Sequence, residues 1–267
     1  MLNFDQRGSG AHTILLLHGF LGSGRNLMSL ARRWSERAPH LKLVFPDLTA
    51  HGTSKAPPKP TLQDVARDVF ALTDHIGADE PLTIVGHSFG GRTALAMRRA
   101  APERVGHIVL LDITPSPIPS GLGGLDHVIQ RVIGAPDEAP AREPMRAYFA
   151  SAGLSPALTD WVLMNLTQDG DTFRWRFDRA ALQYLNEESR KLDLWPAVEG
   201  QFPHGGEKIA LGKTTLIYGE KSNFVSPHDV QRMCSANADV HAIANAGHFL
   251  HVDAQSALLD CLVALDL

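Results

Sequence analysis

Short apolar runs recur along the 267-residue chain and alternate with segments in which apolar residues have helical spacing. The runs have the length of strands, and they cover residues 13–17, 41–45, 82–85, 107–111, 214–218 and 240–243. The helical segments among them are 26–37, 62–76, 92–101 and 255–265. Near-continuous apolar strands that alternate with helices predict an α/β fold, in which a mostly parallel central sheet has helices on both faces.

The alternation stops after Asp112, and about a hundred residues pass before the next sheet-like run begins at Thr214. A Pro- and Gly-rich stretch leads out of the sheet, and helical patterns follow at 125–133, 143–151, 157–166 and 179–185. A structureless loop of this length is uncommon in a compact domain. We therefore predict a core formed by residues 1–112 and 214–267, with a mostly helical lid insertion at 113–213. Half of the chain's Phe, Trp and Tyr residues lie in this insertion. Some of them are expected to line an apolar substrate pocket.

The chemistry-bearing motif is the sequence Gly86-His87-Ser88-Phe89-Gly90, which follows an apolar run and precedes a helical segment. Small residues two positions before and after Ser88 allow it to adopt a strained positive φ that raises its hydroxyl above the sheet edge. A glycine-rich turn that happens to contain a serine is the alternative. The strand before the motif and the helix after it favour a nucleophile elbow, and Ser88 is the predicted nucleophile.

A serine hydroxyl is a poor nucleophile until a neighbouring base takes its proton. The chain has 13 histidines, of which His248 follows the last predicted strand. It should therefore lie at the same carboxyl edge of the sheet as Ser88, and it is the predicted base. His251 falls near the start of the final helix, where a role in packing or at the pocket rim is expected.

The carboxylate that should orient this histidine has two candidate positions. In the loop after residues 214–218, Ser222 stands where a Gly-x-x-Asp pattern would place the acid, and a serine cannot supply a negative charge. Asp112 directly follows a buried apolar run at the same edge, although it could instead cap the turn before Pro115. We predict Asp112 as the acid, and Glu220 remains the second candidate.

The oxyanion of an acyl-transfer intermediate needs two converging N–H donors. The backbone N–H of Phe89, directly after the nucleophile, is one predicted donor. The other is the N–H of Phe20, in a loop where Gly19 and Gly22 permit a close approach to the site. His18 is expected to hold this loop by hydrogen bonds.

Cofactor and metal sites are not expected. Asp47 and His51 lie in one polar segment, 45–54, but they lack a third ligand at a suitable spacing, so a hydrogen-bonded turn at the pocket rim is expected. The sequence has no phosphate-binding Gly-x-Gly-x-x-Gly or Walker pattern, which argues against a nucleotide cofactor.

Composition limits the possible partners. The formal net charge of −4 gives no general attraction to nucleic acid or to anionic membranes, and no apolar stretch has the length of a membrane span. The two cysteines lie far apart, and the N-terminus lacks a signal-peptide pattern, so a cytoplasmic location is expected. The oligomeric state stays open between monomer and dimer.

The motifs resemble the α/β-hydrolase fold family along nearly the whole chain. His18-Gly19-Phe20-Leu21, the elbow at Ser88 and Gly247-His248-Phe249 occur in the family's order. The run Asp112-Ile113-Thr114-Pro115, with a serine at position 222, is similar to YbfF-like serine esterases. This resemblance implies a helical lid inserted after the sixth strand and hydrolysis of acyl esters, including acyl-thioesters, by a triad of Ser88, His248 and Asp112.

Two other functions are compatible with the same triad. A carbon–carbon bond hydrolase acting on a dienoate-type substrate would favour cationic groups in the lid, and four lid arginines keep this possibility open: Arg142, Arg146, Arg174 and Arg176. A small-molecule receptor with slow turnover is the second alternative. A serine at the elbow argues against dehalogenase or epoxide hydrolase chemistry, which uses an aspartate nucleophile.

Overall fold

A computed structural model describes residues 1–122, 125–200, 211–265 and 267 of the chain. Its large sheet has the strand order β1-β3-β2-β4-β5-β9-β10. β1 pairs antiparallel to β3, and every other neighbouring pair is parallel. The strands are β1 (Phe4–Arg7), β2 (His12–Leu17), β3 (Leu41–Pro46), β4 (Leu82–His87), β5 (Val105–Leu111), β9 (Lys213–Gly219) and β10 (Asp239–Ile243). The predicted α/β fold with a mostly parallel sheet is confirmed, and only the short edge strand β1 was not predicted.

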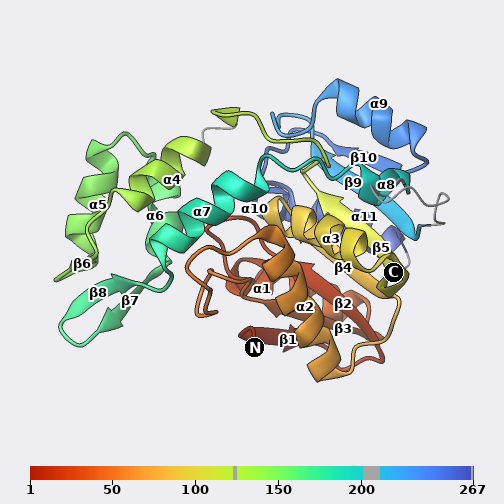
Figure 1. Ribbon diagram of the computed structural model, residues 1–267, viewed down its shortest axis with the longest axis horizontal. Coiled ribbons are helices and arrows are strands. Elements are labelled where there is room, and N and C mark those ends of the chain that lie inside the picture. Colours follow the sequence, from red (N-terminus) through yellow and green to blue (C-terminus); the bar gives the residue numbers. More distant parts are fainter. Residues whose placement is uncertain (123–124, 201–210, 266) are drawn as a thin grey trace.

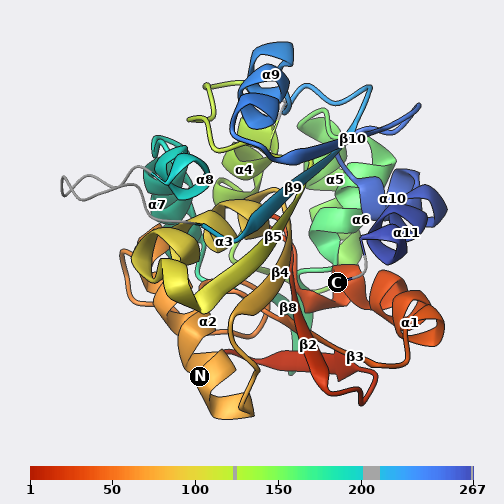
Figure 2. The ribbon, with the colours of Figure 1, turned by 90° about the vertical axis from the view of Figure 1, so that its right-hand side faces the viewer.

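Helices cover both faces of this sheet because its strands are apolar on both sides. Within β2, Leu15 and Leu17 join one buried cluster, whereas Ile14 and Leu16 join the other. Figure 2 shows α2 and α3 on one side of the sheet and α1, α10 and α11 on the other. The helices and short 3-10 turns of this part are η1 (Gly24–Leu27), α1 (Met28–Arg37), α2 (Leu62–Ile76), α3 (Phe89–Ala100), η2 (Pro102–Arg104), α9 (Pro227–Ser235), α10 (Leu250–Asp253) and α11 (Gln255–Ala264).

Local signals fix the ends of α2, whose bounds agree with the predicted segment. The Thr61 hydroxyl accepts a hydrogen bond from the Asp64 N–H (3.2 Å), and the Asp64 carboxylate accepts one from the Thr61 N–H (2.9 Å). This reciprocal capping box satisfies donors that the first turn leaves unpaired. Gly77 ends the helix at a φ of 59°, a left-handed conformation that suits glycine.

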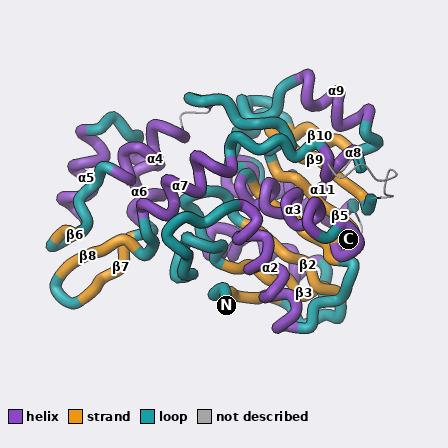
Figure 3. The backbone as a smooth tube through the Cα atoms, in the orientation of Figure 1, coloured by secondary structure: helices purple, strands orange, loops and turns teal. Residues whose placement is uncertain are grey.

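The segment between β5 and β9 adds further helices and a small sheet, and its residues 123–124 and 201–210 lie outside the described residues. Figure 1 shows α4–α7 and β6–β8 extending beside the large sheet, and Figure 3 shows the small sheet apart from the large one. The elements are α4 (Leu125–Ile133), β6 (Glu138–Ala139), α5 (Arg142–Ser151), α6 (Pro156–Leu163), β7 (Leu166–Asp169), β8 (Thr172–Trp175), α7 (Arg179–Ser189) and α8 (Pro196–Glu199). The antiparallel sheet β6-β8-β7 was not predicted, because its strands are short and largely exposed.

We call residues 113–212 the inserted segment, because Lys213 already belongs to β9. It follows β5, which is the fifth strand from the N-terminus among the described residues. The family resemblance predicts the insertion after the sixth strand, so the count differs by one. Arg92, buried in α3, joins the start of this segment and a later part of it to the core. Its guanidinium donates hydrogen bonds to the carbonyls of Ser116 (2.8 Å), Ser189 (2.9 Å) and Leu192 (2.6 Å). The segment is therefore attached to the helix that begins beside Ser88.

Candidate active site

Neighbouring strands of the large sheet bring the predicted site residues to one edge. Ser88 directly follows β4, and Asp112 directly follows β5. The Ser88 N–H donates to the Leu111 carbonyl (3.0 Å), and the Asp112 N–H donates to the Ile217 carbonyl (2.8 Å), so the sheet's hydrogen bonding extends to both residues. His248 lies in the loop after β10, at the same carboxyl edge. Residues far apart in sequence thus reach one edge because they follow parallel strands of the same sheet.

Ser88 occupies the strained turn that its neighbours predict. Its φ and ψ are 50° and −112°, and it is 5% exposed. A Cβ on Gly86 would lie 2.4 Å from the Gly90 carbonyl carbon, and a Cβ on Gly90 would lie 2.2 Å from the Leu17 carbonyl oxygen. Only glycine fits at both positions, so the small residues allow the turn to pack tightly beneath the serine.

A hydrogen bond of 2.7 Å joins His248 Nδ1 to Asp112 Oδ2. The Asp112 side chain is fully buried, and its Oδ1 accepts a second hydrogen bond from the Gly219 N–H (2.9 Å). Because an ionised carboxylate only accepts hydrogen bonds, the His248 proton resides on Nδ1, which leaves Nε2 available as an acceptor. The Glu220 side chain, in contrast, is exposed to solvent.

Ser222 and Phe224 complete the surroundings of this pair, and neither role was predicted. The Ser222 hydroxyl donates to Asp112 Oδ2 and accepts a hydrogen bond from the Phe224 N–H (3.1 Å). The Phe224 ring stacks on the His248 imidazole at a centroid distance of 3.9 Å. The residue at the position where an acid was expected therefore supports Asp112, which follows the neighbouring strand. The serine at position 222 was the sequence signal that could have revealed its hydrogen bond to Asp112. The stacking of Phe224 on His248 has no signature in the local sequence.

Two further histidines lie against this site. His87 Nε2 donates a hydrogen bond to the His248 carbonyl (2.8 Å), and the His251 ring packs against the edge of the His87 ring at 4.8 Å. Burial, reinforced by the His248 and His251 rings, holds the pKa of His87 well below its ordinary value of 6.5. Burial and the neighbouring His248 lower the pKa of His251 to about 4. Both rings are therefore neutral near pH 7, and the predicted packing role of His251 agrees with its buried position.

The loop after β2 approaches the nucleophile closely. A Cβ on Gly19 would lie 2.8 Å from His87 Nδ1 and 3.5 Å from the Ser88 Cβ. As predicted, His18 holds the loop, since its Nδ1 donates to the Gly19 carbonyl (2.8 Å) and its Nε2 accepts from the Leu48 N–H (2.9 Å). The loop is thereby fixed beside Ser88.

The two predicted oxyanion donors belong to neighbouring segments. The Phe20 and Phe89 rings pack edge to face, with centroids 5.4 Å apart. Phe89 is the first residue of α3, where a backbone N–H has no partner within the helix. This N–H directly follows Ser88 in the chain and has no partner within α3.

Asp47 and His51 form the expected hydrogen-bonded turn. The Asp47 carboxylate accepts hydrogen bonds from the N–H groups of Gly24 (2.9 Å) and Thr53 (3.0 Å). The buried His51 ring packs edge to face on Phe20 at 5.0 Å, and burial lowers its pKa to about 3. Among the described residues, no group of three or more His, Cys, Asp or Glu side chains is placed to hold a metal ion.

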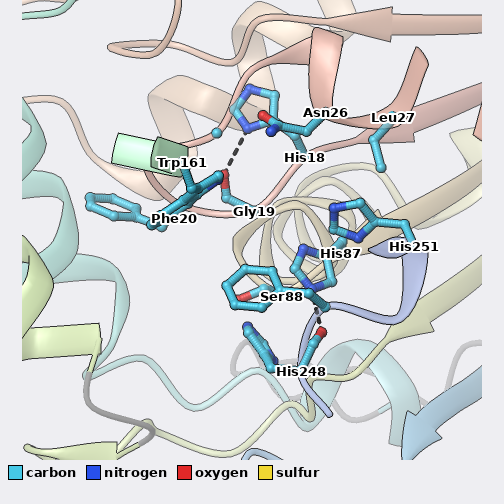
Figure 4. A pocket seen from close by; sticks show the side chains of 12 residues that line it. His18, Gly19, Phe20, Asn26, Leu27, His87, Ser88, Trp161, His248 and His251 are labelled. Carbon is cyan, nitrogen blue, oxygen red and sulfur yellow. Dashed lines mark hydrogen bonds between the residues drawn. The ribbon is translucent and has the colours of Figure 1, made fainter. Parts of the chain in front are cut away.

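A cleft opens above Ser88, with an empty volume of about 400 Å³ that includes space open to solvent. His248 and Phe20 line it, and Trp161 of the inserted segment contributes to its wall. In Figure 4, Ser88 lies with His87 and His248 on one side of the cleft, across from Trp161 and Phe20. An elbow serine and a carboxylate-bound histidine thus line one cleft together with Phe20, an arrangement suited to acyl transfer.

This fold and site define the class of the protein. The chain belongs to the family described as alpha/beta hydrolase fold, whose pattern matches residues 12–255. It is 27% identical to the sn-1-specific diacylglycerol lipase ABHD11 of Mus musculus over 257 residues, which make up 94% of this chain and 80% of the relative. It is 26% identical to Esterase YbfF of Escherichia coli over 258 residues, 92% of this chain and 89% of that protein. This relative confirms the resemblance drawn from the motifs.

Solved structures give the same fold. A marine microorganism esterase superposes with a TM-score of 0.85 at 20% sequence identity, and the match covers 99% of each chain. In the part of the chain that the structure describes, no helix is both long and apolar enough to cross a lipid bilayer.

Proposed function

We propose that this protein is a serine carboxylesterase that hydrolyses small-molecule acyl esters through Ser88, His248 and Asp112. The observation that carries this proposal is the 2.7 Å hydrogen bond between His248 and the buried Asp112, at the sheet edge where Ser88 forms the elbow. The names of its relatives, which include esterases and lipases, support the same activity. We extend the proposal to acyl-thioesters, whose carbonyl carbon is open to the same attack.

In the first half of the reaction, Ser88 Oγ attacks the ester carbonyl carbon while its proton passes to His248 Nε2. Asp112 fixes the imidazole tautomer and stabilises the imidazolium that forms. The negative charge on the carbonyl oxygen is stabilised by the backbone N–H groups of Phe20 and Phe89. When the tetrahedral intermediate collapses, His248 gives its proton to the leaving alcohol, and the acyl group stays on Ser88.

In the second half, a water molecule attacks the acyl-enzyme and gives its proton to His248 Nε2. The new tetrahedral intermediate collapses, the carboxylic acid leaves, and the proton returns to Ser88 Oγ. The reaction consumes one water and requires no cofactor.

The proposal includes a division of labour within the chain. Residues 1–112 and 214–267 supply the reacting groups, and residues 113–213 act as a lid over the cleft. Two observations support this division. Trp161 lines the cleft from the inserted segment, and the buried Arg92 bonds to Ser116 and Ser189 of that segment.

Replacing Ser88 tests the proposal most directly. We expect Ser88→Ala to lower kcat for p-nitrophenyl butyrate by about 10⁴-fold or more, because no hydroxyl remains to form the acyl-enzyme. A fluorophosphonate probe should label the wild-type protein and leave Ser88→Ala unlabelled. Ser235→Ala, which removes an exposed hydroxyl from α9, is the matched control and should keep wild-type activity.

The same assay separates the alternatives. Wild-type turnover that survives in Ser88→Ala would refute the mechanism. Tight binding of an ester by the wild type with negligible turnover would show a receptor instead of an enzyme. Hydrolysis of a dienoate carbon–carbon bond in preference to every ester and thioester of an acyl-chain series would show the second type of hydrolase.

A further inference from the structure

A second hollow lies beside the active-site cleft, between the loop after β2 and the inserted segment. Its empty volume is about 960 Å³, which includes space open to solvent. Asn26 and Trp161 line both this hollow and the cleft that contains Ser88. Arg25, Arg142 and Arg176 also line it, and we call it the arginine pocket.

The three arginines come from distant parts of the sequence. Arg25 lies in η1, Arg142 begins α5, and Arg176 directly follows β8. Burial, and then the positive charges of Arg25 and Arg142, lower the pKa of Arg176, while Asp47 partly offsets this effect. The folded chain thus brings like charges together, an arrangement that costs free energy unless an anion compensates them.

Within the described residues, none of these three guanidinium groups forms an ion pair with an Asp or Glu side chain. Arg142 donates instead to the carbonyls of Leu163 (2.7 Å) and Leu166 (3.0 Å), which are neutral acceptors. The Arg176 Nε is buried without a hydrogen-bond partner. The pocket therefore has positive charge and at least one donor that the protein itself does not satisfy.

Two other arginines of the inserted segment show the contrast. Arg146 pairs with Asp160 at 2.7 Å, and Arg174 pairs with Glu138 at 2.6 Å. Carboxylates are thus available in this part of the chain and pair with these two arginines, which lie outside the pocket.

The pocket adjoins the reacting groups. The Asn165 side-chain amide donates to the Leu21 carbonyl (2.9 Å), which fixes the end of α6 to the loop that carries Phe20. The Trp161 ring packs against the Phe249 ring, with centroids 5.7 Å apart. Phe249 directly follows His248 in the sequence. A group held in the pocket would therefore lie beside the loop that carries the proposed oxyanion donor.

We infer that the arginine pocket binds an anionic oxygen group, a carboxylate or a phosphate, carried by the ester substrate away from its reacting carbonyl. This inference rests on the proposed esterase function and specifies its substrate class. A guanidinium group presents paired N–H donors that match the oxygens of carboxylates and phosphates. Such a group would offset positive charge in the pocket and accept hydrogen bonds from the guanidinium groups that line it.

The test compares two p-nitrophenyl esters of similar length: mono-p-nitrophenyl glutarate, which ends in a carboxylate, and p-nitrophenyl valerate, which ends in a methyl group. We expect the glutarate-to-valerate ratio of kcat/KM to fall about tenfold in Arg176→Gln, the size expected for one lost charge-assisted hydrogen bond. Arg142→Gln should lower the ratio in the same direction. Arg25→Gln should do so without threatening the fold, because Arg25 is exposed.

Arg146→Gln and Arg174→Gln are the matched controls, since they remove the same charge from the same segment outside the pocket. Both should keep the wild-type ratio. A second pair, butyryl-coenzyme A and the butyryl thioester of N-acetylcysteamine, compares a thiol that carries phosphates with one that does not. A response confined to the ester pair identifies a carboxylate, one confined to the thioester pair identifies a phosphate, and a response in both shows that the pocket binds either group.

Two results would overturn the inference, and they are distinguishable. If wild-type protein and Arg25→Gln, Arg142→Gln and Arg176→Gln give the same ratios in both pairs, or if the controls change equally, the pocket does not bind the substrate's anion. The proposed function survives that result, provided that the valerate ester is hydrolysed and Ser88→Ala abolishes the hydrolysis. If no Ser88-dependent hydrolysis of any ester or thioester occurs, the proposed function fails and the inference fails with it.

Discussion

The sheet edge and the inserted segment differ in whether the protein supplies partners for their charged groups. At the sheet edge, the Asp112 carboxylate is fully buried and accepts hydrogen bonds from a histidine, a hydroxyl and a backbone N–H. In the inserted segment, Arg142 and Arg176 face a hollow that contains no carboxylate partner for them among the described residues. A charge whose hydrogen bonds are complete can orient a catalytic group, whereas an uncompensated charge can select a ligand. The comparison suggests that the edge determines the reaction and the segment determines the substrate.

The largest effect is expected from replacing Asp112, whose buried carboxylate accepts three hydrogen bonds. Asp112→Asn keeps the size of the side chain and tolerates the φ of 54° at this position, since asparagine is among the residues that adopt it most readily. It should nevertheless lower kcat by about 10⁴-fold, because an amide does not hold His248 in the required tautomer. Steady-state kinetics with p-nitrophenyl butyrate measure the loss. Glu220→Gln is the control and should stay close to wild type, and the reverse pattern would assign the acid to Glu220.

A smaller effect is expected where the two regions are joined. Arg92→Met removes three hydrogen bonds between α3 and backbone carbonyls of the inserted segment. We expect the free energy of unfolding to fall by about 3 kcal/mol, since the buried carbonyls lose their donors. Denaturant unfolding measures this change, and the folded fraction should also lose esterase activity.

Arg98→Met provides the comparison for this loss of activity. Arg98 is also buried in α3, but it bonds to Thr214 (2.6 Å) and to the Lys213 carbonyl (2.7 Å), which lie in the sheet. This variant should be destabilised while its folded fraction keeps wild-type kcat/KM. Equal losses of activity in both variants would contradict the claim that Arg92 positions the inserted segment.

The smallest effect concerns acid sensitivity, which should originate near the sheet edge. His51 is fully buried, its Nε2 has no hydrogen-bond partner, and its pKa is lowered from 6.5 to about 3. Between these two values the unfolded chain binds a proton that the folded chain does not, so stability falls as the pH falls below 6.5. Lowering the pH from 6.5 to 5 should cost about 2 kcal/mol at this histidine.

Denaturant unfolding of His51→Gln at both pH values measures that contribution, because glutamine does not titrate in this range. The variant should lose less stability than wild type between pH 6.5 and 5. His75→Gln removes an exposed histidine of α2 and should retain the wild-type pH dependence. An unchanged pH dependence in His51→Gln would show that His51 does not carry the effect.

The two regions also differ in how much their sequence predicts. Ser88, Asp112 and His248 each follow an apolar run, and parallel strands place such positions at one edge of the sheet. Their proximity could therefore be expected from the order of strands and residues along the chain. The small sheet β6-β8-β7 escaped prediction because its short strands lack the apolar alternation that marks a half-buried strand.

Tertiary contacts account for the rest. Arg142 and Arg146 are equivalent in the sequence pattern, yet one faces the arginine pocket and the other pairs with Asp160. Phe224 stacks on an imidazole supplied by a different loop. No local pattern encodes either contact, since each depends on where another segment ends.

The hydrogen bond from Ser222 to Asp112 has an evolutionary consequence. The loops after β5 and β9 both reach one imidazole, so each provides a position from which a carboxylate could orient it. A chain with aspartates at both positions would hold two carboxyl groups in contact, and such a pair shares one proton. The protonated member would then donate to its ionised neighbour, as the Ser222 hydroxyl does now. The carboxylate can therefore move between the ends of adjacent strands in single substitutions, with a carboxyl group beside His248 at every step.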